Sequence, residues 1–430
     1  MAISRSGLVV STTVVVLTAV AVAGAGIHLS SQASFRESPK ELIDEVWQII
    51  DRNYVDGTFN QVDWKEIRTE YLGRNYTSDN QAYEAIREML SKLDDPYTRF
   101  MNPEEYKNMQ IDTSGELTGV GIQLTQDEES KKLIVISPIE DSPAFDAGVQ
   151  AQDIILKIDG QSTKDMDINQ AVNLIRGPVG TTVMLIIQRG DKELEFPITR
   201  AKIEVHPVRA SKQTNSTGEV GYIRLNTFSA NAAEEMREAI DDLEKQNVSG
   251  YILDLRSNPG GLLYSSVEIA RMWLNNGDIV STVDRQGEID RQKANSRALT
   301  DKPLVVLVDG GSASASEILS GALQDNKRAV LVGTKTFGKG LVQSVRPVGN
   351  GSGLAVTIAK YFTPSGRDIN HEGIEPDIKV ELTEEQRDVL RKSRDKIGTP
   401  EDPQYAKALD ALMKEVATKQ GTQKKTQATP

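Results

Sequence analysis

Residues 303–324 read PLVVLVDGGSASASEILSGALQ, an apolar run, a glycine turn and an amphipathic stretch in immediate succession. A strand that passes through a Gly-rich turn into a helix is the unit of an α/β layer, whose functional groups gather at the strand ends. A second such unit precedes it, with YILDLRSNPGG at 251–261 and LLYSSVEIARMWL at 262–274. The sequence therefore predicts an α/β core with its site at these turns.

A third apolar run leads into GTKTFGKG at 333–340, which comes within one residue of the phosphate-binding pattern G-x-x-x-x-G-K-S/T. That pattern needs a hydroxyl at the position of Gly340 and a helix directly after it. The following LVQSVRPV at 341–348 alternates apolar and polar residues and contains valines before a proline, which favours a strand. We therefore expect Lys339 to serve a purpose other than phosphate binding.

On both sides of this core, the chain divides into segments that differ in the spacing of their apolar residues and glycines. Residues 37–111 carry apolar residues at helical spacing, and residues 112–200 carry short β-like runs separated by glycines. Residues 201–385 hold the α/β units, and residues 386–430 are expected to form a helix and a polar, disordered tail. The fold class predicted is α+β and multidomain: a helical domain, a β-rich module and an α/β core.

Apolar periodicity also predicts which residues enter the core of each segment. The positions expected to be buried are Leu42, Ile43, Val46, Ile49 and Ile50, then Ala82, Ile86, Met89 and Leu93, and Val183, Leu185 and Ile187.

The first segment, residues 1–33, has the character of an export signal. No Asp, Glu, Lys or Arg stands between Arg5 and Arg36, and small residues at Ser31 and Ala33 offer a cleavage site. The apolar run is longer than a typical signal core and close to the ~20 residues of a spanning helix, so cleavage and retention as a membrane anchor both remain open.

Composition excludes several classes of function. The 430-residue chain has no cysteine, which removes disulfides and thiolate zinc sites, and its three histidines leave almost no material for a Ser-His-Asp triad or a multi-histidine metal site. Its formal charge of −12 repels nucleic acid. We expect neither a cofactor nor a nucleic-acid partner, and the lack of thiols suits an exported protein.

Two neighbouring motifs could carry chemistry. Lys339 stands between Gly338 and Gly340, on backbone that can approach other groups closely. Burial of such a lysine would lower its pKa and free the neutral amine as a general base. The run SASAS at 312–316 lies where a strand turns into a helix, a geometry that can expose a serine nucleophile. The alternative is that SASE at 314–317 is only a helix-capping box.

In combination, GGSASASEILSGAL, TFGKGLVQSV and DLRSNPGGLL resemble the carboxy-terminal processing, or tail-specific, serine peptidases. DDPYTRFMNPEEY at 94–106 and YFTPSGRDINHEGIEPD at 361–377 extend the resemblance from about residue 40 to 385. In that family the middle serine of SASAS is the nucleophile, a lysine 25 residues later is the base, and a glutamine four residues further orients it. The resemblance thus implies Ser314, Lys339 and Gln343 and excludes the flanking serines.

The same resemblance implies an acyl-enzyme mechanism with an oxyanion hole formed by the N–H groups of Gly260 and Ala315. Lys335 lacks the flanking glycines and the spacing of the base. The family's acidic residue 11 positions after the nucleophile is Asp325 here, which we interpret as structural, because a helix would place it ~16 Å from Ser314. His371 is interpreted as a surface residue.

The β-rich module resembles a PDZ domain. Gly119, Val120, Gly121 and Ile122 match its carboxylate-binding loop, and a helix with Ala171, Val172 and Ile175 would wall the side-chain pocket. The resemblance implies an endopeptidase that recognises protein substrates by their C-termini, exported to a periplasm or thylakoid lumen, with oligomerisation left open. Relatives in photosynthetic organisms trim a photosystem II reaction-centre subunit. The alternative is a non-catalytic scaffold that binds C-terminal tails through the PDZ-like module.

Overall fold

The structure, a computed structural model, describes five stretches of the chain, which are residues 38–127, 130–139, 142–164, 166–215 and 218–427. The expected export signal at 1–33 lies outside these residues. Within the described stretches, no helix has both the length and the apolar character needed to cross a bilayer.

The N-terminal region is helical, as the periodicity predicts. It contains α1 (Pro39–Asn53), α2 (Trp64–Gly73) and α3 (Asp79–Ser91), whose N-caps Ser38, Asp63 and Ser78 accept hydrogen bonds from the first turns. The predicted apolar faces pack into one core, with Ile49 partly buried at its edge. Leu354 and Val356 of a distant strand belong to the same core, so these helices pack directly against that strand.

A short segment connects these helices to the rest of the chain. It contains β1 (Arg99–Met101) and α4 (Pro103–Ser114), which begins with a capping box between Asn102 and Glu105. β1 pairs antiparallel with β18 (Ser352–Phe362). The segment just before β1 is thereby fixed on the sheet that contains β18.

The β-rich module is a sheet in the order β3-β4-β5-β7-β8, with β6 paired to β5. Its elements are β3 (Ile122–Gln126), β4 (Leu133–Pro138), α5 (Pro143–Asp146), β5 (Ile154–Ile158), β6 (Gln161–Ser162), α6 (Ile168–Ile175), β7 (Thr182–Arg189) and β8 (Lys192–Thr199). The alternating residues Val183, Leu185 and Ile187 are fully buried, as predicted. β2 (Glu116–Gly119) and β9 (Ala201–Glu204) pair with each other, so the chain enters and leaves the module through one antiparallel ladder.

The core is a sheet of order β10-β11-β12-β15-β16-β19, in which only the β10–β11 pair is antiparallel. Its strands are β10 (Val208–Asn215), β11 (Gly218–Leu225), β12 (Tyr251–Asp254), β15 (Leu304–Val308), β16 (Val330–Gly333) and β19 (Ile378–Lys379). The predicted α/β layer is present, because the two quoted strand-to-helix units are β12 with α8 (Leu263–Trp273) and β15 with α9 (Ala315–Asp325).

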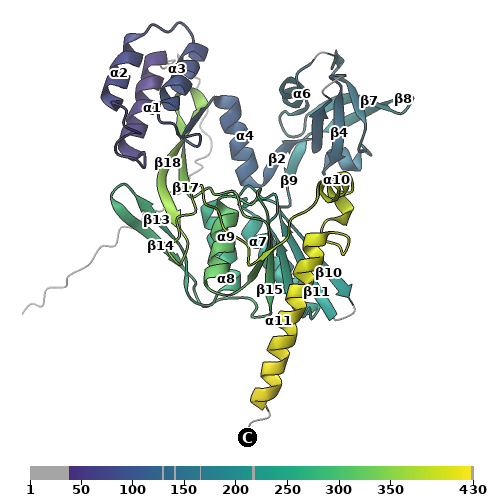
Figure 1. Ribbon diagram of the computed structural model, residues 1–430. Helices are drawn as coiled ribbons and strands as arrows, with labels where there is room; N and C mark the ends of the chain where they lie inside the picture. Colours follow the sequence, from purple (N-terminus) through teal and green to yellow (C-terminus); the bar gives the residue numbers. More distant parts are fainter. Residues whose placement is uncertain (1–37, 128–129, 140–141, 165, 216–217, 428–430) are drawn as a thin grey trace, which may run out of the picture. The chain divides into compact units, whose positions relative to one another are not determined.

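Alternation along these buried strands divides the side chains between two cores. Val306 and Val308 pack with α7 (Ala232–Lys245), α8 and α9 on one face. Val305 and Leu307 pack with α11 (Pro403–Gln427) on the other. Figure 1 shows α8 and α9 side by side and α11 running along the sheet.

A second sheet has the order β1-β18-β13-β14, with β17 paired to β18. It contains β13 (Asp278–Asp284), β14 (Gly287–Lys293) and β17 (Leu341–Val348). A 3₁₀ turn, η1 (Gly349–Gly351), joins β17 to β18. LVQSVRPV is thus a strand, and the lysine loop enters a sheet rather than a helix, as predicted.

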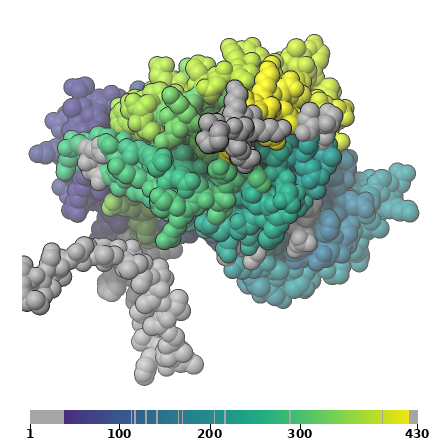
Figure 2. All heavy atoms as spheres, turned by 90° about the horizontal axis from the view of Figure 1, so that it is seen from below, coloured from purple at the N-terminus to yellow at the C-terminus, as the bar shows by residue number. Residues whose placement is uncertain are grey.

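The C-terminal region departs from the prediction in one respect. After α10 (Glu384–Lys392) and η2 (Arg394–Lys396), α11 continues to Gln427, whereas the polar residues from Thr418 onward were expected to be disordered. Its buried residues Tyr405, Leu412 and Val416 dock the helix on the sheet, and Lys419 Nζ binds a carboxylate oxygen of Asp301 at 2.8 Å. In Figure 2 the yellow atoms of the C-terminal part lie against the green and teal atoms of the core. A docked helix can continue into polar sequence that would not form a helix alone.

Candidate active site

Ser314 lies at the turn between β15 and α9, where it is the residue that precedes the first helical turn. Its backbone has φ 54° and ψ −112°, a conformation that costs a non-glycine residue of order 1–3 kcal/mol and that is concentrated at functional sites. The main-chain N–H of Ser314 donates to Glu317 Oε2 at 2.9 Å. Ser314 therefore has the position of a cap residue, as the alternative interpretation required, but a strained one that is partly exposed.

The flanking serines have structural contacts. Ser312 Oγ donates to the Leu255 carbonyl at 2.8 Å, and Ser316 Oγ donates to the Asn258 carbonyl at 2.9 Å. Both residues are fully buried. These two hydroxyls join the serine turn to the loop after β12, which leaves Ser314 as the partly exposed serine of SASAS.

Glu317 connects the serine turn to the lysine loop. Its side chain is fully buried, and its carboxylate accepts four hydrogen bonds. Oε2 accepts from the N–H groups of Ser314 and Lys339, both at 2.9 Å. Oε1 accepts from Thr336 Oγ1 at 2.6 Å and from the N–H of Gly338 at 2.7 Å. One carboxylate thus fixes the main chain of both residues that the sequence analysis singled out.

Tyr361 of β18 makes a second connection between the same residues. Its buried hydroxyl lies 3.1 Å from the Ser314 carbonyl oxygen and also contacts the Lys339 carbonyl oxygen. Burial, followed by the charge of Glu317, raises the pKa of this hydroxyl far above its ordinary value, so it remains a donor at all physiological pH values.

The Lys339 side chain is mostly removed from water. Burial lowers the pKa of its amine, Arg99 adds to this effect, and Asp95 and Glu317 act in the opposite direction. Within the described part of the chain the amine makes no hydrogen bond, and it lies 4.7 Å from the centroid of the Tyr97 ring. An amine with a lowered pKa is suited to proton transfer near neutral pH.

Gln343 lies on β17, immediately after a register shift in the pairing with β18. Its amide nitrogen is 3.5 Å from Thr357 Oγ1, at the limit of a hydrogen bond. The structure thus brings Gln343 to the strand beside the lysine loop, with its amide on Thr357 rather than on the Lys339 amine.

Gly260 packs directly against the serine turn. A Cβ at this position would lie 2.7 Å from the Ala313 carbonyl oxygen and 3.0 Å from Ser314 Cβ, and its φ is 102°. Only glycine fits there without strain. The N–H of Gly260 donates to Asn258 Oδ1 at 2.9 Å, so this expected oxyanion donor has an internal partner. Ala315, the other expected donor, is the first residue of α9, where N–H groups lack helical acceptors.

The residues interpreted as non-catalytic have other contacts. Asp325 accepts from Ser365 Oγ at 2.7 Å and pairs with Arg367 at the far end of α9. Lys335 is exposed and forms an ion pair with Glu375 at 3.4 Å. His371 is also exposed, although its N–H donates to the Gly338 carbonyl at 2.8 Å and so supports the lysine loop through the backbone.

The expected carboxylate-binding loop lies between β2 and β3. Its carbonyl groups are engaged, because Val120 O accepts from Ala144 N–H and Gly121 O accepts from Ile139 N–H, both at 2.8 Å. Gly121 has φ 82°, and an added Cβ would lie 2.3 Å from Ser142 Cβ. β3 pairs only with β4 in the described sheet, which leaves its other edge available for an added strand.

The residues expected to wall a side-chain pocket lie on α6. Ala171 and Ile175 are buried in the module core with Val120, Ile122 packs against this core from β3, and Val172 is partly buried. The helix and the strand edge therefore belong to one packed unit, as peptide binding by strand addition would require.

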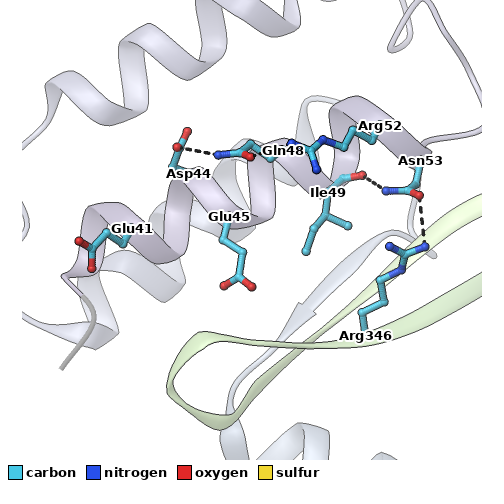
Figure 3. Close-up of a pocket in the computed structure, with 8 residues that line it drawn as sticks. All are labelled: Glu41, Asp44, Glu45, Gln48, Ile49, Arg52, Asn53 and Arg346. Atoms are coloured by element: carbon cyan, nitrogen blue, oxygen red, sulfur yellow. Dashed lines mark hydrogen bonds between the residues drawn. The ribbon is translucent and has the colours of Figure 1, made fainter. Parts of the chain in front are cut away.

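A surface pocket lies elsewhere, between α1 and β17 (Figure 3). It is lined by Glu41, Asp44, Glu45, Gln48, Ile49, Arg52, Asn53 and Arg346. Its polar groups are largely satisfied: Asp44 binds Arg68 at 2.7 Å, and Arg346 contacts Asn53 at 3.2 Å. None of the candidate catalytic residues lines it.

Sequence reasoning missed three contributors to this site. Glu317 was noted only as part of a capping box, while Tyr361 and Tyr97 stood in motifs without an assigned role. A sequence signal existed for Glu317, since the box places it one turn after Ser314. Nothing in the local pattern indicates that Tyr97 or Tyr361 reaches the lysine loop.

Comparison with known proteins agrees with this architecture. Residues 219–380 match peptidase family S41, residues 134–189 match a PDZ domain, and residues 35–91 match the tricorn protease C1 domain. The carboxyl-terminal-processing protease of Synechocystis sp. is 47% identical over 400 residues, which cover 92% of each chain. The chloroplastic C-terminal processing peptidase of Tetradesmus obliquus is 38% identical, covering 80% of this chain and 78% of its own.

A solved structure of a photosystem II D1 C-terminal processing protease is also similar. It is 38% identical, covers 80% of this chain and 94% of its own, and superposes with a TM-score of 0.55. From the core sheet, the PDZ domain and this extent of similarity we conclude that the chain belongs to peptidase family S41 and is a carboxyl-terminal-processing serine protease.

Proposed function

We propose that the protein hydrolyses peptide bonds with Ser314 as nucleophile and Lys339 as general base. The observation that carries the proposal is the shared carboxylate of Glu317, which accepts from the N–H groups of both residues at 2.9 Å. This contact holds the serine turn and the lysine loop together at the end of the core sheet. Burial of the Lys339 amine supplies the lowered pKa that a lysine base needs.

In the first half of the reaction, the neutral Lys339 amine accepts the proton of Ser314 Oγ as the oxygen attacks the substrate carbonyl. The tetrahedral oxyanion is stabilised by N–H donors of Gly260 and Ala315, with Gly260 N–H released from Asn258. The C–N bond then breaks, the ammonium of Lys339 protonates the leaving amine, and an acyl-enzyme remains.

In the second half, Lys339 accepts a proton from water, which attacks the ester carbonyl. Collapse of this intermediate returns the proton to Ser314 Oγ and releases the new carboxyl end. Gln343 acts in this scheme by orienting the amine, which requires its amide to turn from Thr357 toward Lys339.

Substrate choice follows from the PDZ domain. We assign the N–H groups of residues 119–122 to the C-terminal carboxylate of the substrate, with the free edge of β3 pairing to its last residues. A similar solved protein processes the C-terminus of photosystem II D1, so the substrate proposed is the C-terminal extension of such a reaction-centre subunit. The corresponding compartment is the periplasm or thylakoid lumen, reached through the segment at 1–33.

The decisive experiment is a trimming assay with an extended reaction-centre peptide, read by mass spectrometry. Ser314→Ala and Lys339→Ala should abolish cleavage, while Lys335→Ala, which alters an exposed lysine of the same loop, should leave it unchanged. Amidation of the peptide C-terminus should raise KM. Full activity of Lys339→Ala would refute the assignment of the base, and equal KM for the amidated peptide would refute carboxylate capture.

The alternative of a non-catalytic scaffold is not supported, since the chain is a serine protease by its similarity to processing proteases along nearly its whole length. Binding of C-terminal tails remains part of the proposal as the first step of proteolysis.

A further inference from the structure

Tyr97 places an aromatic ring against the amine of Lys339. The ring centroid lies 4.7 Å from Lys339 Nζ, well within the ~6 Å at which an ammonium group is attracted by the face of a ring. Tyr97 belongs to the segment between α3 and β1, far from the lysine loop in the sequence. It is the one aromatic contact of this amine within the described residues.

The backbone that carries Tyr97 is held firmly. Asp95 accepts from Tyr97 N–H at 2.9 Å through Oδ1 and from Thr98 Oγ1 at 2.7 Å through Oδ2. Thr98 Oγ1 in turn accepts from the N–H of Thr357 on β18 at 3.0 Å. The amide of Gln343 approaches the same Thr357 side chain. The turn that presents the ring is therefore anchored on the strand that neighbours the lysine loop.

The charges that act on the amine come from the stretch 95–99 around Tyr97 and from α9. Asp95 favours the ammonium form, whereas Arg99, the first residue of β1, disfavours it. Glu317 of α9 favours the ammonium form. Tyr361 of β18 contacts only the main chain of Lys339 and stays neutral. Since the amine makes no hydrogen bond within the described chain, the ring face is its direct contact that favours the ammonium form, in addition to the charges of Asp95 and Glu317.

We propose that Tyr97 is a positioning residue for the base: its ring binds the ammonium form of Lys339, which must lose its proton to solvent and leave the ring before the neutral amine can accept the proton of Ser314. The proposal rests on the function assigned above to Ser314 and Lys339. The N-terminal region thereby takes part in controlling the base. Tyr97 itself does not titrate in the working range, because burial and the charges of Asp95 and Glu317 raise the pKa of its hydroxyl.

The test is the pH profile of kcat/KM for cleavage of the extended peptide by full-length enzyme. Tyr97→Leu keeps apolar bulk over the amine but removes the ring face, so the acidic limb should move to lower pH by about 0.4 to 1.5 units, the equivalent of one partly desolvated cation–π contact. Tyr97→Phe keeps the face and removes only the hydroxyl, so its limb should coincide with that of the wild type. Tyr97→Met is a second ring-free variant, should the leucine protein fail to fold.

An acidic limb that is unchanged or moves to higher pH in both ring-free variants would overturn the proposal, as would an equal shift in Tyr97→Phe. Lys339→Ala separates this failure from failure of the proposed function. If Lys339→Ala is inactive while the ring-free variants titrate like the wild type, only the role of Tyr97 is lost. If Lys339→Ala is fully active, the base assignment is wrong and the role of Tyr97 falls with it.

Discussion

Glutamine in place of Glu317 tests whether the buried carboxylate connects the two halves of the active site. If Glu317 were only a capping residue, glutamine would serve equally, because α10 of the same chain uses Gln386 at the corresponding position, where it accepts from Thr383 N–H at 2.9 Å. The difference is that Glu317 is fully buried and that each of its oxygens accepts two hydrogen bonds.

The expected loss of stability follows from the number of hydrogen bonds that each oxygen accepts. Glutamine has an NH₂ group in place of one carboxylate oxygen, and this group can only donate. If it replaces Oε2 it faces the N–H groups of Ser314 and Lys339, and if it replaces Oε1 it faces Thr336 Oγ1 and the N–H of Gly338. Each buried donor left without an acceptor costs about 1–3 kcal/mol, so Glu317→Gln should lower the free energy of unfolding by about 2–6 kcal/mol. Displacement of either loop by about 1 Å should lower kcat about 10²-fold.

Thermal unfolding and the peptide-trimming assay measure the two effects. The matched control is Glu41→Gln, which makes the same change in the exposed capping box of α1, where Ser38 N–H donates to Glu41 at 2.7 Å. This control should change stability by no more than about 0.5 kcal/mol and leave kcat unaltered. A Glu317→Gln enzyme with wild-type kcat and melting temperature would show that the carboxylate does not hold the site together.

Three further variants probe separate parts of the molecule. Lys339→Met should be inactive in peptide trimming, yet more stable by about 0.5–2 kcal/mol near pH 6, because it removes a buried ammonium. Folding lowers the pKa of Lys339, so the unfolded chain binds this proton more tightly than the folded chain. The difference in stability between Lys339→Met and the wild type should therefore disappear as pH rises toward ~10.5, which urea unfolding at several pH values would check. Gly260→Ala should lower kcat by about 10² to 10³, since the new methyl would lie 2.7 Å from the Ala313 carbonyl and displace the proposed oxyanion donor; kcat within about twofold of wild type would contradict this. Gly121→Ala, whose methyl would lie 2.3 Å from Ser142 Cβ, should raise KM for free C-termini but not for amidated peptides. An equal rise for both would exclude the loop from carboxylate binding.

The elements of the core could be predicted because their causes are local. Apolar runs, glycine turns and helical spacing lie within a few residues of one another in β12 with α8 and β15 with α9, and the same is true of the alternation that makes β17 a strand. The end of α11 could not be predicted in this way, since its helix depends on docking against a sheet formed by residues far away. Propensity alone favoured disorder there.

The residues of the candidate site also divide into those with local sequence signals and those whose role depends on distant contacts. Lys339 could be singled out by its flanking glycines and the SASAS run by its place between a strand and a helix, while the choice of Ser314 within that run came from the family resemblance and its 25-residue spacing. The second interaction of Glu317 could not, because a capping box looks the same whether or not a distant loop also binds its carboxylate. For Gln343 the sequence predicts a contact that the structure does not contain. Its spacing predicts a partner of Lys339, whereas its amide lies on Thr357.

The chemistry of a serine–lysine pair requires that the amine be shielded from water and also be able to approach the hydroxyl. Neither requirement can be met by the lysine loop alone, because its glycines contribute no side chain that could cover the amine. Here Glu317 and Tyr361 fix the main chain on either side, and Tyr97 covers the side chain from the N-terminal region. Lys339, the proposed base, is therefore fixed through its main chain, while its amine contacts the Tyr97 ring. If Tyr97 acts as proposed, a change that shifts its segment alters the proton affinity of Lys339 without displacing Ser314.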